Sequence, residues 1–223
     1  MNRSFLIESG HAALLAVPNI DTDIIIPQTE LVTTSRRGLG QGLFARWRYL
    51  EGRVPDPAFV LNQPRHRHAA FLIAADNFGC GSSREHAAWA LADFGIRAIV
   101  APGFGEIFQR NCVRNGILPA RVSKDGYTRL AEAAQLAGGG LRLSIDLHHQ
   151  RINCAQFSLT FDIEPDDAAR LLRGTDEIAE TLAHAGAIAR FAAADRTHRP
   201  WVYEPGWEQD EACVADALAQ EAT

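Results

Sequence analysis

The chain has few cysteines and no long apolar run, and each shortage excludes a class of protein. Four cysteines stand more than thirty residues apart, with no C-x-x-C spacing: Cys80, Cys112, Cys154 and Cys213. This pattern is typical of reduced thiols and argues against a disulfide framework, a zinc site or a self-contained iron-sulfur site. No apolar stretch approaches the length that spans a bilayer, and residues 1–10 lack the pattern of a secretory leader. We therefore expect a cytoplasmic protein.

Lysine is nearly absent, because Lys124 is the single lysine among 22 basic residues. The arginines are dispersed along the chain, and 27 acidic residues outweigh them to give a net charge of -5. A net acidic chain without a basic patch offers no electrostatic footprint for nucleic acid or for an anionic membrane. Hydrophobic residues make up 47% and charged residues 22%, which are globular values and argue against long disorder. We expect neither nucleic acid nor a membrane as a partner, and no metal bound by this chain.

The middle of the chain has the pattern of a parallel sheet. Residues 69–75 (AAFLIAA) form a short apolar run that is typical of a buried strand, and 97–101 (RAIVA) form another. Between them, apolar residues of 87–94 recur at helical spacing, and Gly95 stands where a helix often ends. A second helical pattern covers 104–112. The order strand, helix, strand, helix predicts parallel strands with right-handed crossovers.

The second half predicts further helices and an antiparallel pair of strands. A helix is expected over 126–137, and apolar residues then alternate with polar ones over 141–148 and 156–164. A polar turn near 148–153 joins these two runs. Two helices should follow, the second with a buried stripe at Ile178, Leu182, Ala185 and Ala189. We expect one α/β domain over 1–196, with the antiparallel pair in a second layer, and an irregular tail over 197–223.

The segment from Asp76 to His86 (DNFGCGSSREH) carries the clearest chemical signal. It lies between a predicted buried strand and a predicted helix, so its glycines can turn the chain and direct free N–H groups and a helix N-terminus to one point. Such a point favours an anion. Ser82 and Ser83 add hydroxyl groups, and Arg84 adds a planar guanidinium that pairs with a carboxylate through two hydrogen bonds.

A purely structural interpretation of the same segment stays open. Ser82 to Glu85 fits a capping box, in which the serine caps the helix and the glutamate reaches back. Nucleotide-binding interpretations fit less well. Gly79 and Gly81 begin a G-x-G-x-x-G pattern, but Arg84 stands at the third glycine, and no G-K-[ST] follows.

Three strings together resemble a known family: FGCGSSREHA, NIDTDIIIP upstream of it and IVAPGFGEIFQRNCVRNGILP downstream. They are similar to the 3-isopropylmalate dehydratase (isopropylmalate isomerase) small-subunit family and, more distantly, to the C-terminal swivelling domain of aconitase. The resemblance covers about residues 5–196. It implies a swivelling β/β/α three-layer domain.

The resemblance also implies half of an enzyme. The family's large subunit holds a 4Fe-4S cluster that binds the substrate as a Lewis acid, so we expect no cofactor on this chain and a large subunit as its partner. The reaction would interconvert 2-isopropylmalate and 3-isopropylmalate, small dicarboxylates of leucine biosynthesis, by dehydration and rehydration. By resemblance, Ser82 is the base that removes a proton next to a carboxylate, and Ser83 and Arg84, with Gly81, bind the substrate.

Five further residues are candidates for substrate binding. Asp21, Thr22 and Asp23 match the family's N-x-D-T-D turn, although turn chemistry explains them about as well. Arg36 and Arg37 match the segment that selects the substrate's side chain in this family, and a solvated charged loop is the alternative. Sibling hydro-lyases that act on citraconate or homoaconitate share the catalytic loop and stay open. A non-catalytic interaction module of the same fold also stays open, although intact Ser82, Ser83 and Arg84 argue against it.

Overall fold

The computed structural model describes residues 3–31, 35–81, 83–175 and 177–203. The chain divides into two compact units, Met1–Asp176 and Glu177–Thr223. The expected end of the domain at residue 196 falls inside the second unit, so the assignment of 1–196 to one domain stays a prediction. Within the described ranges, no helix is long and apolar enough to cross a membrane.

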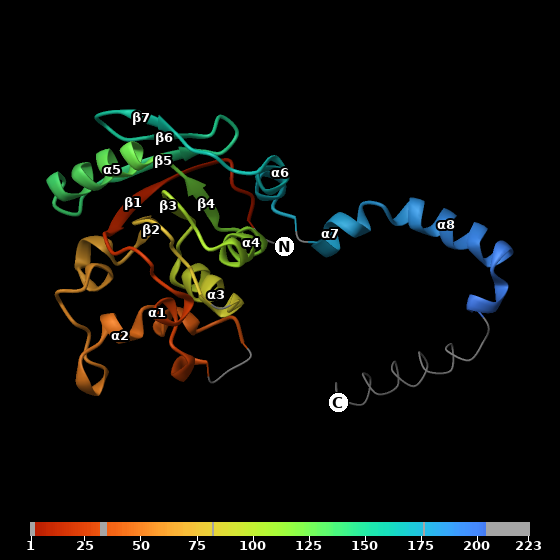
Figure 1. Ribbon diagram of the computed structural model, residues 1–223, viewed down its shortest axis with the longest axis horizontal. Helices are drawn as coiled ribbons and strands as arrows, with labels where there is room; N and C mark the ends of the chain where they lie inside the picture. The colour runs from red at the N-terminus through yellow and green to blue at the C-terminus, as the bar shows by residue number, and fades with distance from the viewer. Residues whose placement is uncertain (1–2, 32–34, 82, 176, 204–223) are drawn as a thin grey trace. The chain divides into compact units, whose positions relative to one another are not determined.

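A seven-stranded sheet forms the centre of the first unit, with the strand order β4-β3-β2-β1-β5-β6-β7 (Figure 1). Four neighbouring strands are parallel, as the sequence predicts: β1 (Ile7–Leu15), β2 (Ala69–Ala74), β3 (Ala98–Ala101) and β4 (Leu118–Arg121). Three antiparallel strands continue the sheet from β1: β5 (Arg142–Asp146), β6 (Arg151–Asn153) and β7 (Ser158–Thr160). The α/β class is therefore confirmed.

The antiparallel strands are hydrogen-bonded to the parallel ones rather than forming a separate sheet. After β7 the chain reaches the opposite edge, where the Asp162 N–H donates to the Arg121 carbonyl oxygen at 2.7 Å. The two edges of the sheet therefore meet at this point, and the predicted second layer is not a separate sheet. The predicted pairing of 141–148 with 156–164 is wrong, because β6 lies between β5 and β7 and pairs with both. The predicted polar turn over 148–153 is wrong in part, because β6 occupies its last three residues.

Helices connect and cover the parallel strands. The longer ones are α3 (Glu85–Phe94), α4 (Glu106–Arg114), α5 (Lys124–Leu136) and α6 (Pro165–Arg173). Between β1 and β2 the chain forms short turns: α1 (Thr22–Ile25), α2 (Ala45–Arg48), η1 (Gln28–Glu30), η2 (Leu39–Gln41), η3 (Glu51–Arg53), η4 (Val60–Asn62) and η5 (Pro64–His66). The predicted helices 87–94, 104–112 and 126–137 are confirmed within a few residues.

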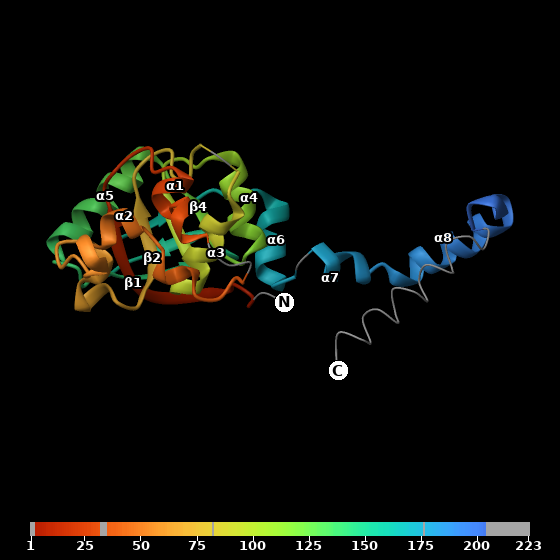
Figure 2. The ribbon, with the colours of Figure 1, turned by 90° about the horizontal axis from the view of Figure 1, so that it is seen from below.

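Successive residues of β2 point to opposite faces of the sheet, so one strand supplies two cores. Leu72 and Ala74 belong to a core that includes residues of α1, α3 and α4. Phe71 and Ile73 belong to a second core with residues of α5, α6 and the antiparallel strands. Figures 1 and 2 show α1 and α3 on one side of β1–β3 and α5 on the other. Burial on both faces explains why the sequence of β2 is a continuous apolar run.

The second unit contains α7 (Glu177–Leu182), α8 (Ala185–His198) and η6 (Pro200–Tyr203). The predicted buried stripe is wrong, because Ile178 and Leu182 are mostly exposed and no described residue of α8 is buried. Helical spacing predicts a helix correctly, but it does not reveal what covers the apolar face. The predicted tail over 197–223 lies mostly outside the described residues.

Candidate active site

Three loops meet at the carboxyl ends of β1, β2 and β3. The backbone N–H of Gly79 donates to the Ile20 carbonyl oxygen at 2.7 Å, and the Thr22 N–H donates to Cys80 at 3.2 Å. On the other side, the Phe78 N–H donates to Gly103 at 3.1 Å. Because parallel strands end at the same edge, residues far apart in sequence become neighbours there, which is where α/β sheets commonly bind ligands.

The loop that follows β2, residues 76–81, is called the glycine loop, and it requires glycine for two reasons. Gly79 has φ +73°, and a Cβ built there would lie 2.1 Å from the Phe108 ring. Gly81 has φ +86° and a Cβ there would lie 3.4 Å from the Asp21 Cβ, so its requirement comes from the backbone conformation. The Gly79 and Gly81 conformations allow the sharp turn that the sequence predicts before α3.

Arg84 occupies the N-cap position of α3. This position differs from the capping box, which needs the cap two residues earlier, and the Glu85 carboxylate accepts instead from the Asn115 side-chain amide at 3.1 Å. The capping-box interpretation is therefore not supported. Ser82, the predicted base, lies outside the described residues, whereas Gly81 and Ser83 on either side of it are exposed.

Asp23 holds the Arg84 guanidinium. Arg84 Nη1 donates to Asp23 Oδ1 at 2.5 Å, and Arg46 Nη1 lies 2.8 Å from the other carboxylate oxygen. The Arg84 hydrogen bond is the largest cause that lowers the pKa of Asp23, with Arg46 and the Gln28 N–H acting in the same direction. The Arg84 side chain is 28% exposed, so a ligand can reach a guanidinium whose position is fixed.

Asp21 and Thr22 have structural partners. The Asp21 carboxylate accepts from the Ile24 N–H at 2.7 Å and thereby caps α1. Thr22 is buried, with 1% of its surface exposed. The structure thus places both residues against the glycine loop, as the Asp21–Cys80 bridge shows. Their direct contact with a substrate stays a prediction.

The segment with Arg36 and Arg37 lies against α3. The Arg36 guanidinium carbon is 4.7 Å from the centre of the Trp89 ring, a cation–π distance. The Asp93 carboxylate accepts from the N–H groups of Gly38 and Gly40 at 3.0 and 2.8 Å. The helix that begins beside the glycine loop therefore also supports this segment. Arg37 is exposed, and its role stays a prediction.

His86 and Cys80 also lie near the glycine loop. The His86 ring packs edge-on against Trp89 with 4.6 Å between ring centres. Cys80 is half-buried in the glycine loop, and its carbonyl oxygen accepts a hydrogen bond from the Thr22 N–H. Among the described residues, no three His, Cys, Asp or Glu side chains form a group that could hold a metal ion.

Sequence reasoning named Asp23 but missed its pairing with Arg84, and it missed Arg46 as the second arginine. Asp23 belongs to the N-x-D-T-D string, so its neighbourhood is predictable although its partner is not. Arg46 gives no comparable signal, because nothing in its sequence context points to Asp23. Together, the positive turn and the held guanidinium make an exposed site for a carboxylate.

Comparisons with known proteins agree with this geometry. A family model described as the aconitase C-terminal domain matches residues 2–125. The 3-isopropylmalate dehydratase small subunit of Cupriavidus necator is 49% identical over 205 residues, which cover 91% of this chain and 99% of that protein. The corresponding protein of Agrobacterium fabrum is 50% identical over 194 residues, or 86% of this chain and 96% of that protein.

One solved structure supports the fold. The crystal structure of 3-isopropylmalate dehydratase from Methanocaldococcus jannaschii matches with a TM-score of 0.63, covering 83% of this chain and 99% of that chain. Its sequence identity is 24%, so this likeness concerns the fold alone. With the family model, it confirms the predicted fold of the aconitase C-terminal type.

Proposed function

This chain belongs to the family of 3-isopropylmalate dehydratase small subunits, and from this premise we propose how its residues take part in the reaction. The chain is the small subunit of a hydro-lyase of leucine biosynthesis, which interconverts 2-isopropylmalate and 3-isopropylmalate. The substrate is a small dicarboxylate. A small subunit implies a large one, and activity requires the complex of both.

In this proposal the iron-sulfur cluster belongs to the large subunit, as the resemblance to the family implies. The cluster would act as a Lewis acid toward the substrate's hydroxyl and carboxylate. This chain's own contribution is then to bind a carboxylate and to accept and return a proton.

Arg84 binds the substrate carboxylate, and Ser83 supports it. Asp23 fixes one edge of the guanidinium, and planar guanidinium groups can bind a carboxylate with two parallel hydrogen bonds. Because the Arg84 side chain is already ordered in the free protein, it loses less conformational entropy when the substrate binds. The position of Arg84, held by Asp23 at the joined loops, is the observation that carries the proposal.

Ser82 is the base that takes the proton next to a carboxylate. A serine hydroxyl is a weak base at neutral pH, so its anion needs stabilisation. The neighbouring residues supply this stabilisation: Gly81 turns the chain with positive φ, α3 begins at Glu85, and Arg84 adds a cation. Exclusion of water by the large subunit would strengthen each of these interactions.

Arg36 and Arg37 select the substrate's side chain. Support comes from the Arg36 contact with Trp89 and from the anchoring of Gly38 and Gly40 to Asp93. The segment with Arg36 and Arg37 is thereby connected to α3, the helix that follows the glycine loop. A change at Arg36 is expected to alter the preference among 2-isopropylmalate, 2-methylmalate and homocitrate.

Reconstitution tests the proposal directly. The full chain is mixed with its anaerobically prepared large subunit, and the formation of 3-isopropylmalate from 2-isopropylmalate is followed. We expect no turnover with either chain alone and rapid turnover with both. Full activity of this chain alone in metal-free buffer would contradict the proposal, as would an intact pair that turns over 2-methylmalate but no isopropylmalate.

A further inference from the structure

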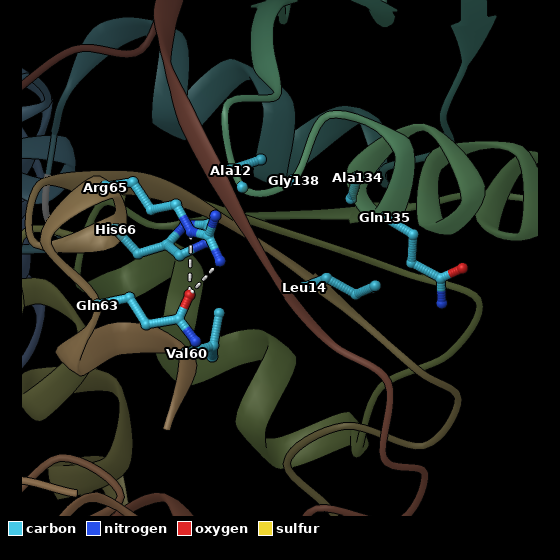
Figure 3. A pocket seen from close by; sticks show the side chains of 10 residues that line it. Ala12, Leu14, Val60, Gln63, Arg65, His66, Ala134, Gln135 and Gly138 are labelled. Atoms are coloured by element: carbon cyan, nitrogen blue, oxygen red, sulfur yellow. Dashed lines mark hydrogen bonds between the residues drawn. The ribbon is translucent and has the colours of Figure 1, made fainter. Parts of the chain in front are cut away.

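A cavity of about 210 Å³ lies in the first unit, and none of its lining residues belongs to the candidate active site (Figure 3). Its walls come from β1, from η4 and η5, and from the end of α5. Leu14, Val60 and Ala134 make one part of the lining apolar. Gln63, Arg65 and His66 make another part polar, so the cavity has two chemically different sides.

The polar side contains nitrogen atoms without a hydrogen-bond partner among the described residues. Arg65 Nε and Nη2 donate to Gln63 Oε1 at 3.0 and 2.8 Å, which fixes the guanidinium and leaves Nη1 without a partner among the described residues. His66 is 4% exposed, and its Nδ1 is fully covered without a hydrogen-bond partner. Nε2 is therefore the ring nitrogen that a ligand in the cavity can reach.

Gly139 brings these two donors together. A Cβ built on Gly139 would lie 2.5 Å from Arg65 Nε and 2.7 Å from His66 Nε2. Both nitrogens thus lie against the backbone of Gly139, where a larger residue would not fit. Gly139 has φ +92°, a conformation that other residues rarely adopt.

Charge favours an anion in this space. No acidic residue is among the described residues that line the cavity, whereas Arg65 carries a full positive charge. Burial is the largest cause that lowers the pKa of His66, and Arg65 and His11 act in the same direction. An anionic ligand would therefore gain a charge-assisted hydrogen bond from Arg65.

We propose that this cavity binds a small monocarboxylate with a short branched aliphatic chain. The carboxylate accepts hydrogen bonds from Arg65 Nη1 and His66 Nε2, and the alkyl group lies against Leu14 and Val60. A fixed guanidinium and a buried imidazole on one side, and apolar side chains on the other, match the two ends of such a molecule. The site does not depend on the proposed role of Ser82 or Arg84.

Titration calorimetry of the full chain with sodium 3-methylbutanoate tests this proposal. We expect saturable binding at one site per chain, with a Kd of about 1 mM. Two matched probes separate the contributions: 3-methylbutanamide keeps the alkyl group without the charge, and inorganic phosphate keeps charge without the alkyl group. Each should bind at least about tenfold more weakly than 3-methylbutanoate.

Variants locate the binding to this cavity. Arg65→Gln should weaken binding of 3-methylbutanoate at least about tenfold, because it removes a charged donor. Arg67→Gln changes the same charge at a neighbouring exposed arginine outside the lining and should leave the affinity unchanged. Ala134→Leu, which fills the apolar side, should abolish binding. Thermal unfolding of each variant shows whether it is folded.

Three results would overturn the proposal. The first is the absence of saturable 3-methylbutanoate binding to the wild-type chain. The second is an equal loss of affinity in Arg65→Gln and Arg67→Gln, which would indicate a general charge effect. The third is binding of phosphate as tight as that of 3-methylbutanoate, which would remove the role of the apolar side.

Discussion

Replacing Asp23 with asparagine tests whether this carboxylate holds Arg84 ready for the substrate. Asparagine keeps the size of the side chain but removes the charge that pairs with Arg84 Nη1 at 2.5 Å. A fully formed hydrogen bond to a charged group contributes about 1.5–3 kcal/mol, and solvent reduces this because both side chains are nearly one-third exposed. We therefore expect the Asp23–Arg84 interaction to contribute about 1 kcal/mol to substrate binding, and its loss to raise KM roughly fivefold.

The assay is steady-state turnover of 3-isopropylmalate by the reconstituted complex, with kcat and KM determined separately. Because Asp23 acts on binding, kcat should change little. Arg46→Gln is the matched control. It removes the other arginine on Asp23, whose side chain is 59% exposed, so the pair contributes less and KM should change less than twofold. An unchanged KM in Asp23→Asn, or an equal rise in Arg46→Gln, would refute the reasoning.

Three other predictions follow from the site and the fold. Arg84→Lys keeps the charge but loses the two-pronged fit, so KM should rise markedly, and an unchanged KM would indicate that Arg84 only packs against Asp23. Gly79→Ala should lower the free energy of unfolding by about 2–4 kcal/mol in denaturant titrations, because its Cβ meets Phe108 and its φ is positive, whereas Gly52→Ala, with open space around it, should lower it less. His66 has a pKa below the ordinary 6.5, so the unfolded chain binds a proton there more readily; stability should fall as pH drops below about 6.5, and His66→Gln should make that fall shallower in thermal unfolding.

The local parts of the fold could be predicted from sequence because they depend on neighbouring residues. The apolar run of β2, the helical spacing of α3 and the αL glycine at Gly95 are short-range signals, and the structure has each of them. The glycine loop is equally local. Gly79 and Gly81 both have positive φ, as a sharp turn before a helix requires.

Long-range pairings could not be predicted in the same way. The Arg84–Asp23 hydrogen bond joins residues 61 positions apart and exists only because two parallel strands end side by side. The short strand β6 could not be predicted from its polar sequence, because three residues show too little alternation of polar and apolar side chains to distinguish a strand from a turn. The exposed Ile178 and Leu182 show that helical periodicity identifies an apolar face without identifying what it contacts.

The role of Ser82 as the proton acceptor is tested most directly by the turnover of reconstituted complexes that carry Ser82→Ala or Ser83→Ala. If Ser82 is the base, its replacement should lower kcat by about 10²- to 10⁴-fold with little change in KM, while the complex still assembles. Ser83→Ala, one residue away, should mainly raise KM. Near-normal turnover in the Ser82→Ala complex, or an equal loss of kcat in both variants, would contradict the assignment of the proton acceptor to this loop.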